Sequence, residues 1–239
     1  MSIWKRLAAA TSNLTVGSPL AGLLAGNRES QDAPNRVELS DQPDNQIPFT
    51  LGIIALSAKM AKADGRVTRD EVEAFKDAFK VSPGEMKEAA RAFNLAKRDV
   101  TGYEVLASEL VDLFKGNRKL LEDVLEGLFH IAKADEEVHP TEEQFLGRVA
   151  KLFGFTDAEF THIKARHSVA ARRNPYEVLG VEARISDEEL KRHYRRLVAD
   201  NQPDKLLARG VPVELVTIAT EKVATITEAY EAIAKERSI

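Results

Sequence analysis

The sequence predicts an all-helical protein with two helical parts in one chain. Ala, Leu, Glu and Lys dominate its 239 residues, and these are strong helix formers. Capping sequences of the form Ser/Thr-x-x-Glu/Gln recur along the chain, each ahead of apolar residues at helical spacing. Apolar residues make up 44 % of the chain, which is enough to bury a core. Together these observations favour helical bundles over sheets.

The first 26 residues form a segment of their own. From Leu7 to Gly26, 20 residues carry no charge, and Lys5 and Arg6 precede them. A run of about 20 apolar residues can cross a bilayer, but Thr, Ser, Asn and Gly dilute this one. Three alternatives remain for residues 1–26: a membrane anchor or membrane-surface segment, a disordered tail, or a cleaved signal. Residues 27–46 are polar and rich in Pro, Ser, Asn and Asp, which predicts a linker.

Residues 47–170 predict a helical bundle. The periodicity indicates about seven helices between Pro48 and Ala170, joined by connections short enough for antiparallel neighbours. The capping sequences that start helices here and further on begin at Thr68, Ser82, Thr141, Thr156 and Ser186.

An internal repeat lies within this bundle. Ala61–Val67 (AKADGRV) recurs as Ala132–Val138 (AKADEEV), 71 residues later. Such a duplication predicts two equivalent helix pairs, each with a short acidic connection.

Four carboxylates repeat with the same offset. Asp64 and Asp135 end strong helical runs, which is the unfavourable end of the helix dipole for an acid. Glu71 and Glu142 follow in the first turn of the next helix. Four such oxygens suit a hard cation such as Ca²⁺ or Mg²⁺, whereas turn and capping roles are the structural alternative.

The two copies, AKADGRVTRDEVEAF and IAKADEEVHPTEEQF, resemble the TerB-like domain, a helical and internally duplicated module. The resemblance implies that a divalent cation binds at Asp64, Glu71, Asp135 and Glu142. It also implies that this domain contacts a client or a recruiting protein whose identity the sequence does not reveal.

The C-terminal part, residues 174–239, predicts a helical hairpin. A short helix begins at Asn174-Pro175, and a second helix begins after Ser186 and extends to about Asn201. Pro203 is expected to end it, because proline disfavours helical geometry in the residue before it. A third helix is expected from about Pro212 to Lys235.

The second helix carries a basic face opposite its apolar stripe. Lys191, Arg192, Arg195 and Arg196 crowd this face, and like charges on adjacent turns cost a few tenths of a kcal/mol per pair. An acidic docking partner explains such a stripe, because charge complementarity speeds and orients association. The net charge of −4 and the absence of an aromatic stacking platform weigh against nucleic acid as the partner.

Three segments of this part resemble the J-domain over its core: NPYEVLGV, SDEELKRHYRRLVADNQPDK and ATITEAYEAI. The additional stretch LLARGVPVELVTIATEKVATI is similar to the DjlA subclass of J-domain co-chaperones. The resemblance implies docking on a DnaK-type ATPase and stimulation of its ATP hydrolysis. It assigns partner contacts to Lys191, Arg192, Tyr194, Arg195, Arg196, Gln202, Pro203, Asp204 and Lys205.

Gln202 departs from the family pattern, which has His at this position. Glutamine keeps hydrogen-bonding capacity but cannot be protonated, so docking is expected and ATPase stimulation is in doubt. Two explanations stay open: an introduced inactivating substitution, or a J-like domain that binds without activating.

The sequence thus predicts a co-chaperone that acts on the cytoplasmic face, with anchorage to the bacterial inner membrane if the first segment is an anchor. No enzyme activity and no required cofactor are expected, since the chain has no Gly-rich phosphate loop, nucleophile elbow or zinc-hydrolase helix. The absence of cysteine excludes thiolate chemistry. The alternative function is a metal-binding stress-response module with a degenerate J-like tether.

Overall fold

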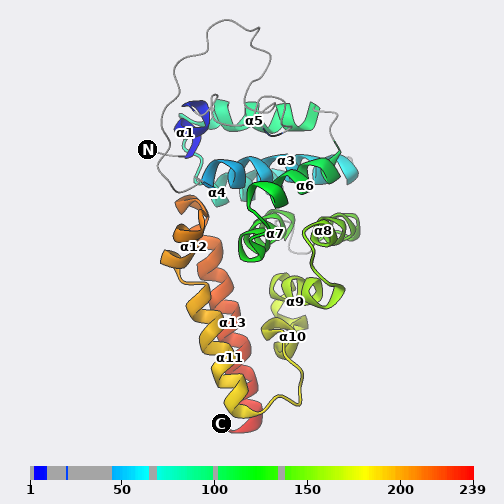
Figure 1. The fold of residues 1–239 in the computed structure, drawn as a ribbon, viewed down its shortest axis with the longest axis vertical. Helices are drawn as coiled ribbons and strands as arrows, with labels where there is room; N and C mark the ends of the chain where they lie inside the picture. The colour runs from blue at the N-terminus through cyan, green and yellow to red at the C-terminus, as the bar shows by residue number, and fades with distance from the viewer. Residues whose placement is uncertain (1–2, 10–19, 21–44, 65–68, 99–101, 134–137) are drawn as a thin grey trace, which may run out of the picture.

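The computed structural model describes residues 3–9, 20, 45–64, 69–98, 102–133 and 138–239 (Figure 1). Every regular element in these residues is helical, which confirms the predicted fold class. The elements are α1 (Ile3–Ala9), α3 (Gln46–Asp64), α4 (Arg69–Ala78), α5 (Met86–Arg98), α6 (Tyr103–Leu113), α7 (Arg118–Ala132), α8 (Pro140–Leu152), α9 (Asp157–His167), η2 (Ala170–Arg172), α10 (Pro175–Leu179), α11 (Asp187–Asp200), α12 (Pro203–Arg209), η3 (Val213–Leu215) and α13 (Val216–Arg237).

Helix α3 is the centre of the bundle. Its residues from Phe49 to Ala61 are buried, because α5, α6, α7 and α8 pack around it. A helix that is apolar on all sides is stable only inside a protein. Gly127 allows α7 to approach closely, since a Cβ there would lie 2.7 Å from Cδ1 of Ile53.

Two of the predicted capping boxes form as expected. The Thr156 hydroxyl accepts from the backbone N–H of Glu159, whose carboxylate accepts from the N–H of Thr156 at 2.8 Å. Ser186 and Glu189 make the same reciprocal pair at the start of α11. Each box satisfies two N–H groups that a helix start leaves without partners. Thr68 lies outside the described residues.

The predicted start of α8 at Thr141 is wrong. His139 is the N-cap, Pro140 is the first helical residue, and the Glu142 carboxylate accepts from the His139 N–H at 2.9 Å. Proline suits the first helical position, because its fixed φ matches the helix and its missing N–H would have no partner there. The helix therefore begins ahead of Thr141.

The N-terminal helix α1 packs on the bundle. Ile3, Trp4 and Leu7 are buried, and the Trp4 ring lies 6.2 Å and 5.8 Å from the rings of Phe75 and Phe79. None of the described helices is both long and apolar enough to cross a membrane. Most of the uncharged segment and linker that the sequence indicates, residues 10–19 and 21–44, lie outside the described residues.

The C-terminal hairpin has its own core. Helices α11 and α13 lie side by side and project from the bundle, with the C-terminus at the far end (Figure 1). Arg237 ties that far end together, since its guanidinium donates to the Ile185 carbonyl and to the Asp187 carboxylate at 2.8 Å. The buried residues of this core are Ala165, Val178, Leu179, Leu190, Ile226, Ala229 and Ile233.

The segment between the tip and the third helix joins the bundle. It forms α12 and η3, which the sequence did not predict, and Gly210 closes α12 with a left-handed φ of 98°. Its buried residues belong to the core of the bundle rather than to that of the hairpin. These residues are Leu206, Val211 and Leu215, together with Ile218 and Ala219 at the start of α13. Helix α13 is thus shared between both cores.

Candidate docking site

The outer face of α11 and the tip that follows it form the candidate site. The inner face is fixed by packing: the rings of Tyr194 and Tyr230 stack at 4.1 Å with an interplanar angle of 8°. The Tyr194 hydroxyl lies 3.4 Å from Oγ1 of Thr227 on α13. Tyr194, predicted as a partner contact, therefore also holds the hairpin together.

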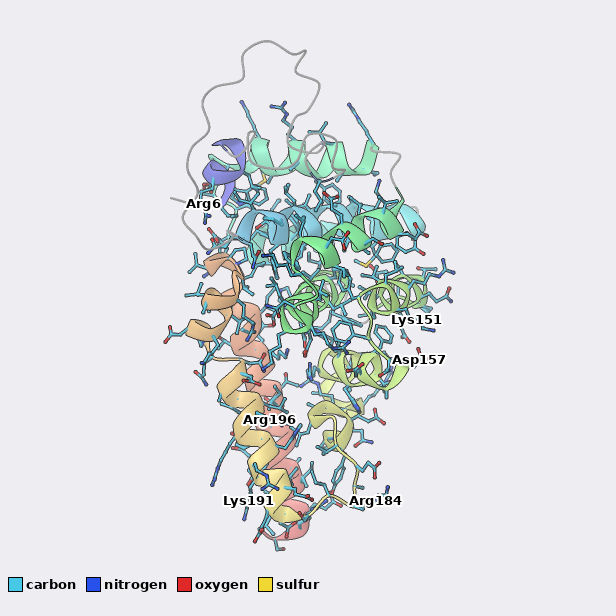
Figure 2. All side chains as sticks on the ribbon, in the orientation of Figure 1. Arg6, Lys151, Asp157, Arg184, Lys191 and Arg196 are labelled. Atoms are coloured by element: carbon cyan, nitrogen blue, oxygen red, sulfur yellow. The ribbon has the colours of Figure 1, made fainter. Side chains whose placement is uncertain are left out.

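The predicted cations are displayed on α11. Arg192, Arg195 and Arg196 are exposed, and Lys191 is half-buried. Figure 2 shows Lys191 and Arg196 at successive levels of α11, on the part of the hairpin that projects from the bundle. Among the described residues no carboxylate forms an ion pair with any of these four side chains. The face is therefore cationic, with the Glu189 carboxylate in the first turn of α11 attracting Arg192.

The tip is a tight connection between α11 and α12. Asn201 is buried and donates from Nδ2 to the Leu197 carbonyl at 2.8 Å, which closes α11. Gln202 is the N-cap of α12 without a capping bond, and its Nε2 donates to the Val198 carbonyl at 3.3 Å. Pro203, Asp204 and Lys205 follow in the first turn of α12. All four residues from Gln202 to Lys205 are exposed, so a partner can reach them.

A buried cluster of charges joins the hairpin to the bundle. Lys222 on α13 is buried, and its ammonium group lies 2.9 Å from Glu122 and 3.0 Å from Glu126. Arg166 donates to the same two carboxylates at 2.7 Å and 2.6 Å. His167 bonds the second oxygen of Glu126 through Nε2. The full cluster is Glu122, Asp123 and Glu126 of α7, Arg166 and His167 of α9, Arg209 of α12 and Lys222 of α13.

The pKa values in the cluster follow from burial and pairing. Burial alone would raise the pKa of Glu122, but the charges of Lys222 and Arg166 outweigh it and lower the pKa to about 2. For Asp123 burial dominates and raises the pKa to about 6, although Lys222 and Arg209 oppose the shift. Three carboxylates thus meet three permanent cations in a largely buried interface, in which Glu122 is half-buried.

Sequence reasoning missed this cluster. One signal was present: Lys222 lies between Ala219 and Ile226 on the inward stripe of the third helix, where a charge needs a buried partner. Glu122 and Glu126 are four residues apart on α7 and so share a helix face. Nothing in the sequence shows that these two faces meet.

The four proposed metal ligands are only partly visible. Glu142 caps α8, Asp135 lies outside the described residues, and for Asp64 and Glu71 only the backbone is described. Within the described part of the chain, no group of three His, Asp or Glu side chains is placed to hold a metal ion. The four-carboxylate cation site stays a prediction.

Fold and site together define a class: a helical bundle that carries a C-terminal helical hairpin with a cationic face and an exposed Pro-Asp tip. The chain matches the family described as tellurite resistance protein TerB over residues 50–165 and the DnaJ domain family over residues 174–238. No solved structure matches the chain.

The family of the chain follows from its similarity to known proteins. The chain is 30 % identical to the co-chaperone protein DjlA of Vibrio cholerae, over 83 % of this chain and 81 % of that protein. It is 31 % identical to the protein of the same name from Coxiella burnetii, over 75 % and 74 %, and 28 % identical to that from Photobacterium profundum, over 83 % and 81 %. The chain belongs to the DjlA family of co-chaperones.

The substitution Lys222→Met tests the buried cluster. It leaves the acidic pair on α7 without one of its cations, so the free energy of unfolding should fall by about 3 kcal/mol. Urea unfolding of the full chain measures this. Lys235→Met, at an exposed position on the same helix, is the matched control and should change stability by less than about 0.5 kcal/mol. Equal effects of the two variants would contradict a paired, buried Lys222.

The raised pKa of Asp123 predicts a pH dependence. Its folded pKa of about 6 exceeds the ordinary aspartate pKa of 3.8, so the folded state binds the proton more tightly. The stability contribution of Asp123 is therefore present at low pH and is lost as the pH rises through about 6. Relative to Asp123→Asn, the natural chain should lose about 2 kcal/mol of unfolding free energy between about pH 4.5 and about pH 7. Urea unfolding at the two pH values checks the sign, and a constant difference would contradict it.

Proposed function

We propose that this chain is a co-chaperone that docks a DnaK-type ATPase through the outer face of α11 and the tip from Gln202 to Lys205. The observation that carries the proposal is the exposed cationic face of α11, which leads directly into an exposed Pro-Asp tip. Such a face guides an acidic partner by long-range attraction and fixes its orientation on contact. The membership in the DjlA family supports the same partner class.

The chain acts in this proposal by binding, with no catalytic activity of its own. The bundle has a separate task, which is contact with a client or recruiting protein. A cytoplasmic location fits a DnaK-type partner, and anchorage to the inner membrane through residues 1–26 stays part of the proposal. The hairpin supplies the docking surface, and the partner supplies the ATPase.

Gln202 is the position at which docking and activation separate. Pro203 and Asp204 keep the tip geometry, and Gln202 accommodates the N-cap conformation with φ −65° and ψ 145°. Its side chain offers an amide where the related domains offer an ionisable ring. We expect this chain to bind its partner and to stimulate it weakly.

The substitution Gln202→His should restore stimulation. We expect ATP turnover by a purified DnaK-type chaperone to rise on the order of tenfold above that with the natural chain, the rate effect of about 1.4 kcal/mol. Single-turnover ATP hydrolysis at saturating co-chaperone measures this. Adding Asp204→Asn to Gln202→His is the control and should remove the gain. If neither the natural chain nor Gln202→His raises turnover, the chain is not an activating co-chaperone.

Charge reversal on α11 tests the docking face. Arg195→Glu should lower the association rate constant for the chaperone roughly tenfold at low ionic strength, because it weakens electrostatic steering. Surface plasmon resonance at two salt concentrations measures the rate and its screening. Arg184→Glu is the matched control, since Arg184 is exposed below α10 and already paired with Glu182 (Figure 2). Similar losses for both variants would point to net charge alone rather than to a docking face.

A further inference from the structure

Arg209 at the end of α12 connects the tip to the bundle. Its Nη1 donates to the backbone carbonyl of Asp200 at 2.8 Å, and Asp200 is the last residue of α11. Its Nε and Nη2 donate to Oδ2 of Asp123 on α7 at 3.1 Å and 2.8 Å. One guanidinium therefore holds the end of α11 and a buried carboxylate of the bundle at the same time.

A second contact fixes the same point. The ammonium group of Lys119, also on α7, pairs with the carboxylate of Asp200. This pair is half exposed and is worth little alone, but it acts on the residue that Arg209 already holds. Helix α7 thus contacts Asp200, just before the tip, and Arg209, at the end of the helix that contains the tip.

The tip has little freedom between these anchors. The seven residues of α12 span about 10 Å at the ordinary helical rise. Gly210 closes the helix directly after Arg209, and Leu206 before this point and Val211 after it are buried in the bundle core. Figure 1 shows α12 at the end of the hairpin that meets the bundle, away from the C-terminus. The position of the tip is therefore set by α7.

We propose that Arg209 is a positioning residue for chaperone docking, and that Asp123 and Lys119 make α7 of the bundle a part of the docking machinery. Arginine suits this task because its planar fork can donate in two directions from one rigid group. Lysine can keep one of these bonds but not both. This inference rests on the proposed docking function, and it adds that the bundle sets the geometry of the tip.

The test uses the full chain with Gln202→His as the parent. Adding Arg209→Lys should raise the co-chaperone concentration that gives half-maximal ATPase stimulation by about tenfold, the effect of one lost charge-assisted hydrogen bond. Adding Lys222→Met instead is the matched control. The Lys222 ammonium group pairs with Glu122 and Glu126, so its loss weakens the interface between α13 and α7 without releasing Asp200. It should leave the half-maximal concentration unchanged.

A second measurement does not depend on the chaperone. Hydrogen exchange followed by mass spectrometry should show faster exchange at residues 204–207 in Arg209→Lys and not in Lys222→Met. Asp123→Asn removes the negative charge that the Arg209 guanidinium pairs with, so combining it with Arg209→Lys should cost no more than the larger single effect.

The outcomes separate the two proposals. If the Gln202→His parent neither binds nor stimulates the chaperone, the docking function itself fails. If the parent is active and Arg209→Lys behaves like Lys222→Met in both measurements, the positioning role is overturned. Additive effects of Arg209→Lys and Asp123→Asn would overturn it as well, because the two groups would then act independently.

Discussion

The charge balance on α7 is the constraint on which the rest of the structure depends. Glu122, Asp123 and Glu126 lie within two turns of one helix and are largely removed from water. Buried carboxylates are costly without partners, and their partners here come from α9, α12 and α13. Helix α7 is therefore buried with its charges paired because α9, α12 and α13 pack against it. Such a cluster specifies an arrangement more than it adds stability.

Because of this charge pairing, the regions of this chain that match the TerB and DnaJ families are not structurally independent. A bundle and a J-domain joined by a flexible linker would have separate cores and independent motions. Here α13 contributes Ile218 and Ala219 to the core of the bundle and Ile226 and Ile233 to that of the hairpin. A force or ligand that shifts α7 must therefore act on α13 and on α12. The hairpin is presented to its partner at an angle that the bundle determines.

The sequence predicted what local patterns determine. Helical periodicity predicted the seven helices of the described bundle and the hairpin, and the Pro-Asp tip and basic face lie where the motifs placed them. The capping sequences at Thr156 and Ser186 marked helix starts, whereas the one at Ser82 did not, because α5 begins at Met86. The start of α8 was wrong because Pro140 outweighs the Thr141 capping sequence. The charge cluster was missed because its members are up to 100 residues apart, as Lys222 and Glu122 are. With charged residues at 30 % of the chain, one lysine on an apolar stripe does not stand out.

At the tip, the position of the backbone and the chemical group offered to a partner depend on different residues. The place of the tip is fixed by Pro203, by the carbonyl of Asp200 and by Arg209, none of which involves the side chain of Gln202. That side chain instead reaches back to the Val198 carbonyl of α11. Replacing it therefore alters the chemical group offered to the partner while the surrounding geometry persists. In the proposed docking, affinity, which α11 would supply through charge, and activation, which the tip would supply through chemistry, then need not change together.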